Sequence, residues 1–272
     1  MDISMLEEKA RTMRAWIMKG IAEAGSGHPG GSLSLVEIMV WLYYAGLSVG
    51  PGEEWNDRRD RVVLTKGHGA PALYTILAMK GFLPMEELLT LRKLGSRLQG
   101  HPDMKKLPGV EMSTGSLGHG LSVANGMALG LRLQGIDSKV VAIMGDGELQ
   151  EGQVWEAAMT AAHFRLNNLT AFVDFNNLQI DGHVDEIMGV APIDEKFAAF
   201  GWEVVNIDGH SFREIAEAFT RVRTDRPRVI VARTVKGKGV DYMENVAGWH
   251  GKAPTREQAE AYIESMGGNC RG

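Results

Sequence analysis

The pattern of hydrophobic and polar positions divides the chain into alternating helical and extended segments. A first helix, ending near Gly25, is predicted by apolar residues at helical spacing, namely Leu6, Ala10, Met13, Ile17 and Ile21. The same periodicity predicts helices at residues 35–44, 70–80, 121–133, 152–164, 212–222 and 255–266. Short apolar or β-branched runs predict strands at residues 62–65, 140–144, 169–174, 202–207 and 228–234.

Strands that alternate with helices are typical of a parallel sheet covered by helices on both faces. Each strand–helix–strand unit favours a right-handed crossover between neighbouring parallel strands. The pattern therefore predicts a three-layer α/β domain with a mostly parallel sheet. Because no repeat, low-complexity segment or linker interrupts the pattern, we expect residues 1–272 to form a single domain.

Composition excludes several classes of function. The net charge of −5 and the pI near 5.9 leave no basic footprint for nucleic acid. The single cysteine, Cys270, cannot form an internal disulfide, and no Cys/His zinc spacing is present. Charged residues recur along the first 16 residues, which therefore lack the apolar core of a signal peptide. No apolar run is long enough to span a bilayer. We therefore expect a cytoplasmic protein with neither a nucleic acid nor a membrane as partner.

The segment at residues 140–181 carries the clearest candidate chemistry. Asp146 follows one predicted strand within a Gly-Asp-Gly turn, and Asn176 follows the next. Ligands of parallel sheets bind at the carboxyl ends of the strands, so these two residues should lie close together. A carboxylate and an amide oxygen with open remaining positions suit Mg²⁺, which shares phosphate oxygens. Gly145 and Gly147 allow backbone N–H groups to face a phosphate. The segment thus predicts a diphosphate held through Mg²⁺.

Two other interpretations of this segment stay open at this point. A plain Gly-Asp-Gly turn beside an Asn-rich loop is common in α/β proteins and binds nothing. A dinucleotide-binding fingerprint fits less well, because the next glycine is Gly152 and the spacing is not G-x-G-x-x-G. Asp146 would also repel a pyrophosphate unless a cation lay between them.

Three histidines, His28, His68 and His101, lie beside glycines in predicted loops. A neutral imidazole near pH 7 can relay protons or bind sugar hydroxyls. A zinc site with three histidine ligands is the alternative, which spacing alone does not exclude. Residues 113–120 form a Gly-rich segment at a predicted helix start, which can present N–H groups to an anion or permit close packing.

Seven motifs taken together resemble the N-terminal, diphosphate-binding part of transketolases. In chain order they are SGHPGGS, KGHGAP, QGHPD, STGSLGHG, GDGELQEG, NNLQIDGHV and WHGKAP. The resemblance covers nearly the whole chain and implies a thiamine diphosphate-binding fold, with thiamine diphosphate and Mg²⁺ as cofactors. It implies that Asp146 and Asn176 bind Mg²⁺ through their side chains and Leu178 through its carbonyl. It also implies that Gly147 and Asn176 contact thiamine diphosphate.

The resemblance extends to the substrate channel. His28, His101 and His250 would be the catalytic residues lining it, and His250 would also approach the cofactor. Cofactor contacts are further implied for His68, Gly115, Ser116 and Leu117. The family has Gly-Pro-Leu-Gly-Gln-Gly where this chain has Ser116 in place of Pro and His119 in place of Gln. No role is carried over to His119.

The implied activity is transfer of a two-carbon ketol unit from a ketose phosphate to an aldose phosphate. In the family, a second domain binds the pyrimidine ring and supplies a glutamate that activates the cofactor. No segment that could be that domain follows the final predicted helix. The chain is thus expected to be either a shortened form or one half of a split enzyme. The split enzyme would form an α2β2 assembly with a C-terminal, pyrimidine-binding subunit.

Two alternative functions remain. The α-subunit of a 2-oxo-acid dehydrogenase shares the Gly-Asp-Gly and Asn signature, although the loop histidines favour a sugar substrate. A non-catalytic partner that keeps the cofactor fold as an assembly platform is the other alternative. Bound thiamine diphosphate and turnover with a partner chain would separate both from a transketolase.

Overall fold

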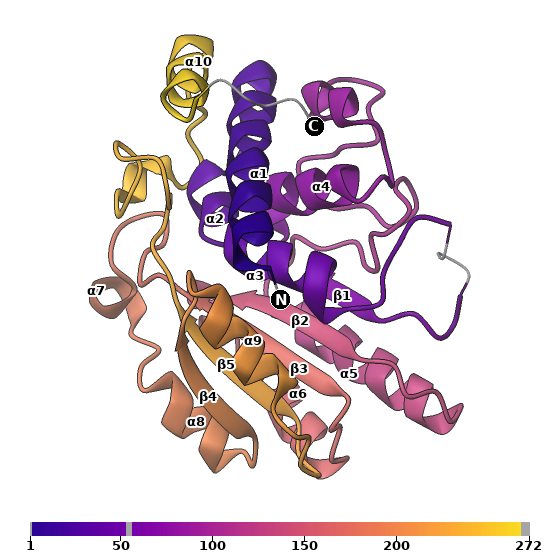
Figure 1. Ribbon diagram of the computed structural model, residues 1–272. Coiled ribbons are helices and arrows are strands. Elements are labelled where there is room, and N and C mark those ends of the chain that lie inside the picture. The colour runs from indigo at the N-terminus through magenta and orange to yellow at the C-terminus, as the bar shows by residue number, and fades with distance from the viewer. Residues whose placement is uncertain (1, 53–55, 268–272) are drawn as a thin grey trace.

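A five-stranded parallel sheet forms the centre of the protein (Figure 1). The computed structural model describes residues 2–52 and 56–267, so Cys270 lies outside the described residues. The strands are β1 (Arg61–Leu64), β2 (Val140–Gly145), β3 (Leu169–Phe175), β4 (Glu203–Asp208) and β5 (Arg228–Arg233). Their order is β1-β2-β3-β5-β4, and every neighbouring pair is parallel. This confirms the predicted sheet.

Helices cover both faces of the sheet, so both faces are apolar. Successive residues of each strand point to opposite faces. On β2, Val141 and Ile143 belong to one hydrophobic core. Val140, Ala142 and Met144 of the same strand belong to the other. The two cores lie on opposite faces of the sheet, which confirms the three layers.

Different helices fill the two cores. On one face lie α1 (Ile3–Ala24), α3 (Val36–Trp41), α4 (Ala70–Met79) and α9 (Phe212–Thr220), with α10 (Arg256–Ser265) against α1. On the other lie α5 (His119–Leu133), α6 (Gly152–His163) and α8 (Ile193–Ala199). The remaining helical segments are α2 (Pro29–Leu33), α7 (Val184–Met188), η1 (Leu42–Gly46), η2 (Gly67–Gly69), η3 (Met85–Thr90), η4 (Gly147–Gln150) and η5 (Ala247–Trp249).

Helix α1 shows how local sequence sets an element's ends. The Asp2 side chain accepts a hydrogen bond from Met5 N and caps the helix start. Gly25 ends the helix with φ 64°, a left-handed conformation that glycine adopts without strain. The apolar residues that predicted the helix are all buried: Leu6, Ala10, Met13, Ile17 and Ile21.

Two predictions about helices were wrong in detail. The single helix expected at residues 35–44 is divided into α3 and the π-helix η1. The loop expected at residues 26–32 instead contains helix α2, which begins at Pro29, because proline is suited to the first helical position. Helices α7 and α8 were not predicted, since each has too few turns to show a clear period.

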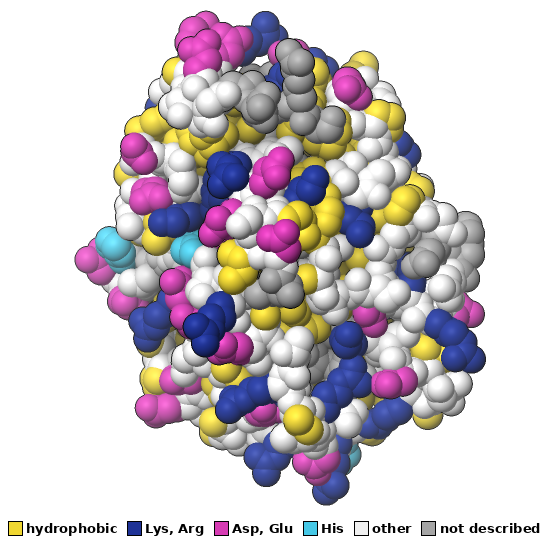
Figure 2. Space-filling model, viewed as in Figure 1, with side chains coloured by type: hydrophobic (Ala, Val, Ile, Leu, Met, Phe, Trp, Pro, Cys, Tyr) yellow, Lys and Arg dark blue, Asp and Glu magenta, His cyan; other side chains and the backbone are white. Residues whose placement is uncertain are grey.

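The surface is charged and mixed. On the face seen in Figure 2, Lys and Arg side chains are interspersed with Asp and Glu. Within residues 2–52 and 56–267, no helix is long and apolar enough to cross a membrane.

Candidate functional site

The candidate site lies at the carboxyl edge of the sheet, where the parallel strands end together (Figure 1). Strand β1 is followed by Lys66 and His68, β2 by Asp146, β3 by Asn176 and β5 by Lys236. Four separate loops thus deliver charged and polar side chains to one edge. A parallel sheet does this because all its strands point the same way.

Asp146 is a buried carboxylate held by backbone N–H groups. One oxygen accepts a hydrogen bond from Gly147 N at 2.8 Å and the other from Asn177 N at 2.5 Å. Burial, together with the nearby charge of Asp174, raises the pKa of Asp146 to about 6. A carboxylate in this position would be stabilised by a cation.

The loop at residues 176–178 adds two further oxygen atoms beside Asp146. The side-chain oxygen of Asn176 accepts a hydrogen bond from Leu178 N at 3.1 Å, which fixes its orientation. The carbonyl oxygen of Leu178 accepts from Lys236 Nζ at 2.8 Å, so an ammonium group already contacts this oxygen. Carboxylate, amide and carbonyl oxygens are the donor set that suits Mg²⁺. The residues present therefore fit this metal.

Beneath these oxygens lies a buried ion pair between Lys66 and Asp174. Asp174 also accepts hydrogen bonds from Thr234 Oγ1 and, at 2.6 Å, from Ser34 Oγ, while Lys66 donates to Gly31 O at 2.9 Å. Burial opposes the charge of Asp174, but Lys66 and these donors outweigh it and hold its pKa low. Sequence reasoning did not single out this pair. The sequence feature that could have identified the pair is a single charged residue at the end of each of two apolar strands.

The structure brings four histidines together above the edge. The ring centroid of His28 lies 5.5 Å from that of His68, 6.4 Å from His101 and 5.4 Å from His250. The centroids of His68 and His250 are 5.1 Å apart. These four residues, which we call the imidazole cluster, come from loops that are far apart in the sequence. Among the described residues, no group of three or more His, Cys, Asp or Glu side chains is arranged to hold a metal ion.

The imidazole cluster is neutral near pH 7. Burial, with the charge of Arg92 next, lowers the pKa of His28 to about 4. Burial and the charge of Lys236 lower the pKa of His250 to about 3. Burial also lowers the pKa values of His68 and His101. Neutral rings can both donate and accept hydrogen bonds, which suits the binding of hydroxyl groups.

Lys236 is the main site residue that sequence reasoning missed. Its ammonium lies 2.8 Å from Leu178 O and 2.8 Å from His250 Nδ1, so it joins the oxygen atoms to the imidazole cluster. Burial, with the charge of Lys66 next, lowers its pKa to about 8. The sequence offered no reason to choose it, because the Lys-Gly-Lys-Gly stretch at residues 236–239 lacks the G-x-x-x-x-G-K-[ST] pattern of a phosphate loop. Arg92 was also missed; its guanidinium lies 3.4 Å from His28 Nδ1 at the exposed side of the cluster.

The Gly-rich segment before α5 packs directly on the loop after β1. A Cβ atom on Gly67 would lie 2.6 Å from Gly115 N, and one on Gly115 would lie 3.1 Å from a ring atom of His101. Thr114 Oγ1 is buried there without a hydrogen-bond partner among the described residues. Ser116 is exposed and Leu117 is half-buried. The segment therefore borders the imidazole cluster and contains one buried polar atom without a partner among the described residues.

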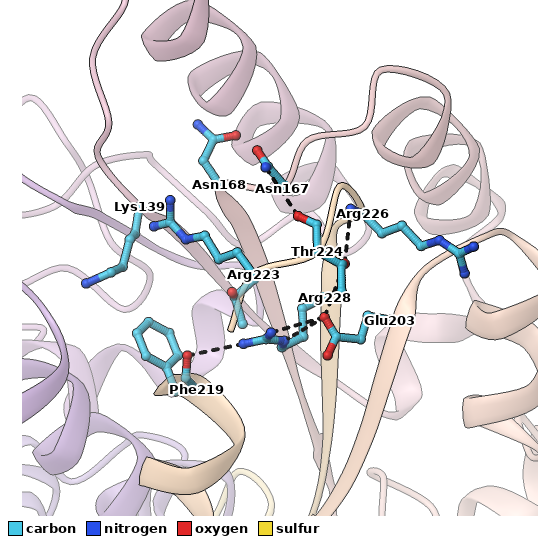
Figure 3. Close-up of a pocket in the computed structure, with 10 residues that line it drawn as sticks. Lys139, Asn167, Asn168, Glu203, Phe219, Arg223, Thr224, Arg226 and Arg228 are labelled. Carbon is cyan, nitrogen blue, oxygen red and sulfur yellow. Dashed lines mark hydrogen bonds and ion pairs between the residues drawn. The ribbon is translucent and has the colours of Figure 1, made fainter. Parts of the chain in front are cut away.

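Figure 3 shows a different pocket, at the amino ends of the strands. Arg228 there donates to Glu203 and to the carbonyl oxygens of Ala218, Phe219 and Arg221. The guanidinium thus closes the end of α9, and the remaining space of about 20 Å³ has room for a single water. This pocket is part of the fold's structural support rather than a candidate active site.

The carboxyl edge of the sheet brings Asp146 and the 176–178 loop next to Lys236 and the imidazole cluster. The family model of the transketolase thiamine diphosphate-binding domain matches residues 6–270. The chain belongs to the transketolase family and contains this thiamine diphosphate-binding domain. The comparisons thus support the transketolase resemblance over the 2-oxo-acid dehydrogenase alternative.

Relatives of two lengths match the chain. A subunit of a 6-deoxy-6-sulfo-D-fructose transketolase from Clostridium sp. (strain MSTE9) is 42% identical, with 96% of each chain covered. A subunit of an apulose-4-phosphate transketolase from Phocaeicola vulgatus is 39% identical over 98% of this chain and 95% of that one. The transketolase of Pongo abelii is 40% identical over 97% of this chain, which spans 42% of its length. The crystal structure of Campylobacter jejuni transketolase superposes with a TM-score of 0.93 at 34% identity, covering all of this chain and 44% of that one.

Proposed function

We propose that this chain is the N-terminal subunit of a two-chain transketolase. The enzyme would transfer a two-carbon ketol unit from a ketose phosphate to an aldose phosphate, using thiamine diphosphate and Mg²⁺. One observation carries the proposal: the Asp146 carboxylate binds the loop that carries Asn176 and Leu178, and Lys236 links Leu178 O to His250 of the imidazole cluster. A diphosphate site and a hydroxyl-binding site are thus contiguous.

The proposed metal ligands are the side chains of Asp146 and Asn176 and the carbonyl of Leu178. Gly147 N and the Asn176 side chain would contact the diphosphate, and the Lys236 ammonium would balance its charge. Removing the charge of Lys236 should weaken this binding, because a buried anion needs a cation within contact distance.

The rest of the cofactor would lie between His68 and the segment formed by Gly115, Ser116 and Leu117. This placement is supported by the buried Thr114 Oγ1 at the same wall, which has no partner among the described residues. Close packing of Gly67 on Gly115 fixes the wall's position, since no larger residue fits at either point.

When bound, thiamine diphosphate supplies a nucleophilic carbon and a sink for the electron pair of the reacting sugar. The chain's own residues bind and orient the sugar. His28, His101 and His250 are neutral at pH 7, so they can accept a proton from one hydroxyl and return it to another. His28 and His250 are half-buried, whereas His101 is exposed.

A separate C-terminal subunit would bind the pyrimidine ring. Two relatives of the same length are named as subunits, whereas the longer transketolases extend well beyond this chain. The α5–α6 face is a suitable contact surface, because Leu133, Met159 and Phe164 are 79%, 51% and 43% exposed there. An α2β2 assembly would follow from closed twofold symmetry.

Single alanine variants of His28, His101 and His250 test the proposed sugar contacts. Each variant, assayed with the partner subunit, should lose kcat/KM by roughly 100-fold or more if the ring transfers a proton. Thiamine diphosphate affinity should change much less for His28→Ala and His101→Ala, since His250 is the one of the three that contacts Lys236. Steady-state kinetics and cofactor titration separate the two effects. Normal turnover in all three variants would remove these histidines from the mechanism.

Metal affinity should depend on pH through Asp146, whose pKa is raised to about 6. Above this pH the carboxylate is already charged and ready to bind Mg²⁺. Below it, binding must first release a proton, so the affinity should fall by up to about tenfold per pH unit. The stability of the metal-free chain should change with pH in the opposite direction to the Mg²⁺ affinity. Because the pKa of Asp146 is raised in the folded state, protonation of Asp146 stabilises the fold, and this stabilisation is lost as the pH rises towards 6.

Calorimetric titration of Mg²⁺ between about pH 5 and about pH 8 measures this dependence. The variant Asp146→Asn is the control, because an amide does not titrate; its binding should be weak at every pH. An affinity of the unaltered chain that stays constant across this range would contradict the assignment of Asp146 as a ligand.

A further inference from the structure

The turn Asp208-Gly209-His210 after β4 contacts the loop that carries Lys236. His210 Nε2 accepts a hydrogen bond from Val235 N at 2.8 Å. Because this nitrogen accepts, it carries no hydrogen, and Nδ1 must donate to Glu37 Oε2, which lies at 2.9 Å. One side chain thus connects the end of β5 with helix α3.

The contact continues to a second point on the same loop. The other oxygen of Glu37 accepts from Arg14 Nη2 at 2.5 Å, and Arg14 Nε donates to Lys238 O at 2.9 Å. The side chains of Arg14, Glu37 and His210 are only 9%, 9% and 12% exposed. Three buried side chains therefore hold the loop on both sides of Lys236, at Val235 N and Lys238 O.

Gly209 lets the turn approach the loop closely. Its N–H donates to Arg233 O at 2.8 Å. A Cβ atom at this position would lie 2.5 Å from the Thr234 methyl carbon and 3.1 Å from Ala232 Cβ. The turn therefore packs directly against the residues that lead into the site, one of which, Thr234, binds Asp174.

We propose that His210 is a positioning residue for the diphosphate site. With Glu37 and Arg14 it fixes residues 235–238, so that the Lys236 ammonium reaches Leu178 O and His250. The backbone of this loop also contacts Gly30 and Asn245, through Gly237 N to Gly30 O at 3.0 Å and Asn245 N to Lys236 O at 2.9 Å, so the three side chains add to a partly fixed loop. The proposal rests on the role given to Lys236 above.

Two substitutions separate the two hydrogen bonds of His210. In His210→Gln the side-chain oxygen reaches the position of Nε2 and can still accept from Val235 N. In His210→Asn the amide reaches the position of Nδ1 and can still donate to Glu37. If His210 acts by fixing the loop, glutamine should preserve its effect and asparagine should not.

The first measurement is amide hydrogen exchange of residues 233–240 in the ligand-free chain. We expect His210→Asn to accelerate exchange at least about tenfold, and His210→Gln to change it less than about threefold. In titrations with inorganic pyrophosphate and Mg²⁺, His210→Asn should likewise lower the affinity for pyrophosphate more than His210→Gln does. The matched controls are His163→Asn and His163→Gln at an exposed histidine of α6, which should change neither quantity.

A double-mutant cycle with Lys236→Met shows whether His210 acts through Lys236. The loss of pyrophosphate affinity caused by His210→Asn should largely disappear when Lys236 is already replaced. Equal effects of the asparagine and glutamine variants, or additive effects in the cycle, would overturn the proposal. If the unaltered chain bound no magnesium pyrophosphate, the proposed function would fail instead, and the exchange rates alone would decide the role of His210.

Discussion

Replacing Asp146 by alanine should abolish Mg²⁺-dependent binding of thiamine diphosphate and leave the fold intact. The carboxylate is the only charged group among the proposed metal ligands. Loss of groups that merely orient metal ligands costs about 10- to 100-fold in affinity, so loss of a ligand itself should cost at least about 100-fold. The substitution leaves the N–H groups of Gly147 and Asn177 without acceptors, at about 1–3 kcal/mol each. A domain of this size can tolerate that loss.

Titration calorimetry with thiamine diphosphate and Mg²⁺, in the presence of the partner subunit, measures the effect. Circular dichroism and the melting temperature of each variant show whether the fold is retained. Asp225→Ala is the matched control, because this exposed aspartate lies far from the carboxyl edge and pairs only with exposed Arg165 among the described residues. Unchanged cofactor affinity in Asp146→Ala would rule out the proposed metal site.

The isolated chain should have no ketol-transfer activity, and a pyrimidine-binding polypeptide should restore it. The residues of this chain are proposed to hold a diphosphate and a sugar, but activation of the cofactor requires removal of a proton from its thiazolium ring. In the transketolase resemblance, the acid that assists this step belongs to the other half. The exposed apolar residues of the α5–α6 face, such as Leu133, would be covered in the complete enzyme.

The test is an assay of ketol transfer with the purified chain alone and with a candidate C-terminal subunit, together with the mass of each species in solution. We expect activity only in the mixture, and a mass corresponding to two copies of each chain. Leu133→Glu should weaken assembly without disturbing the site, because the side chain is 79% exposed in this chain. Full activity of the 272-residue chain by itself would refute the two-chain proposal.

The sheet could be predicted from the sequence because its strands are short apolar runs between longer helical patterns. All five predicted strands are present, with ends that differ by at most one residue. The strand order could not be predicted, since it depends on where each crossover packs. Helix α8 escaped prediction because only Ile193 and Phe197 mark its buried face, and two positions define no period.

Some residues of the candidate site could also be predicted from the sequence, and others could not. Asp146 and Asn176 could be predicted because each follows a strand within a motif, and topology then requires them to meet. Lys66, Asp174 and Lys236 could not, because their importance lies in which group each contacts. The hydrogen bond from Lys236 to Leu178 O joins residues that are far apart in the chain. Such a contact leaves no local pattern in the sequence.

The buried charges at the carboxyl edge have one more consequence, which concerns the order of binding. Three buried carboxylates, Asp146, Glu148 and Asp174, lie near two ammonium groups, Lys66 and Lys236, at this edge. A diphosphate that bound without a metal ion would add further negative charge to this buried place. If both ions bind as proposed, we expect Mg²⁺ to raise the affinity for the diphosphate, and the diphosphate to raise the affinity for Mg²⁺ by the same factor.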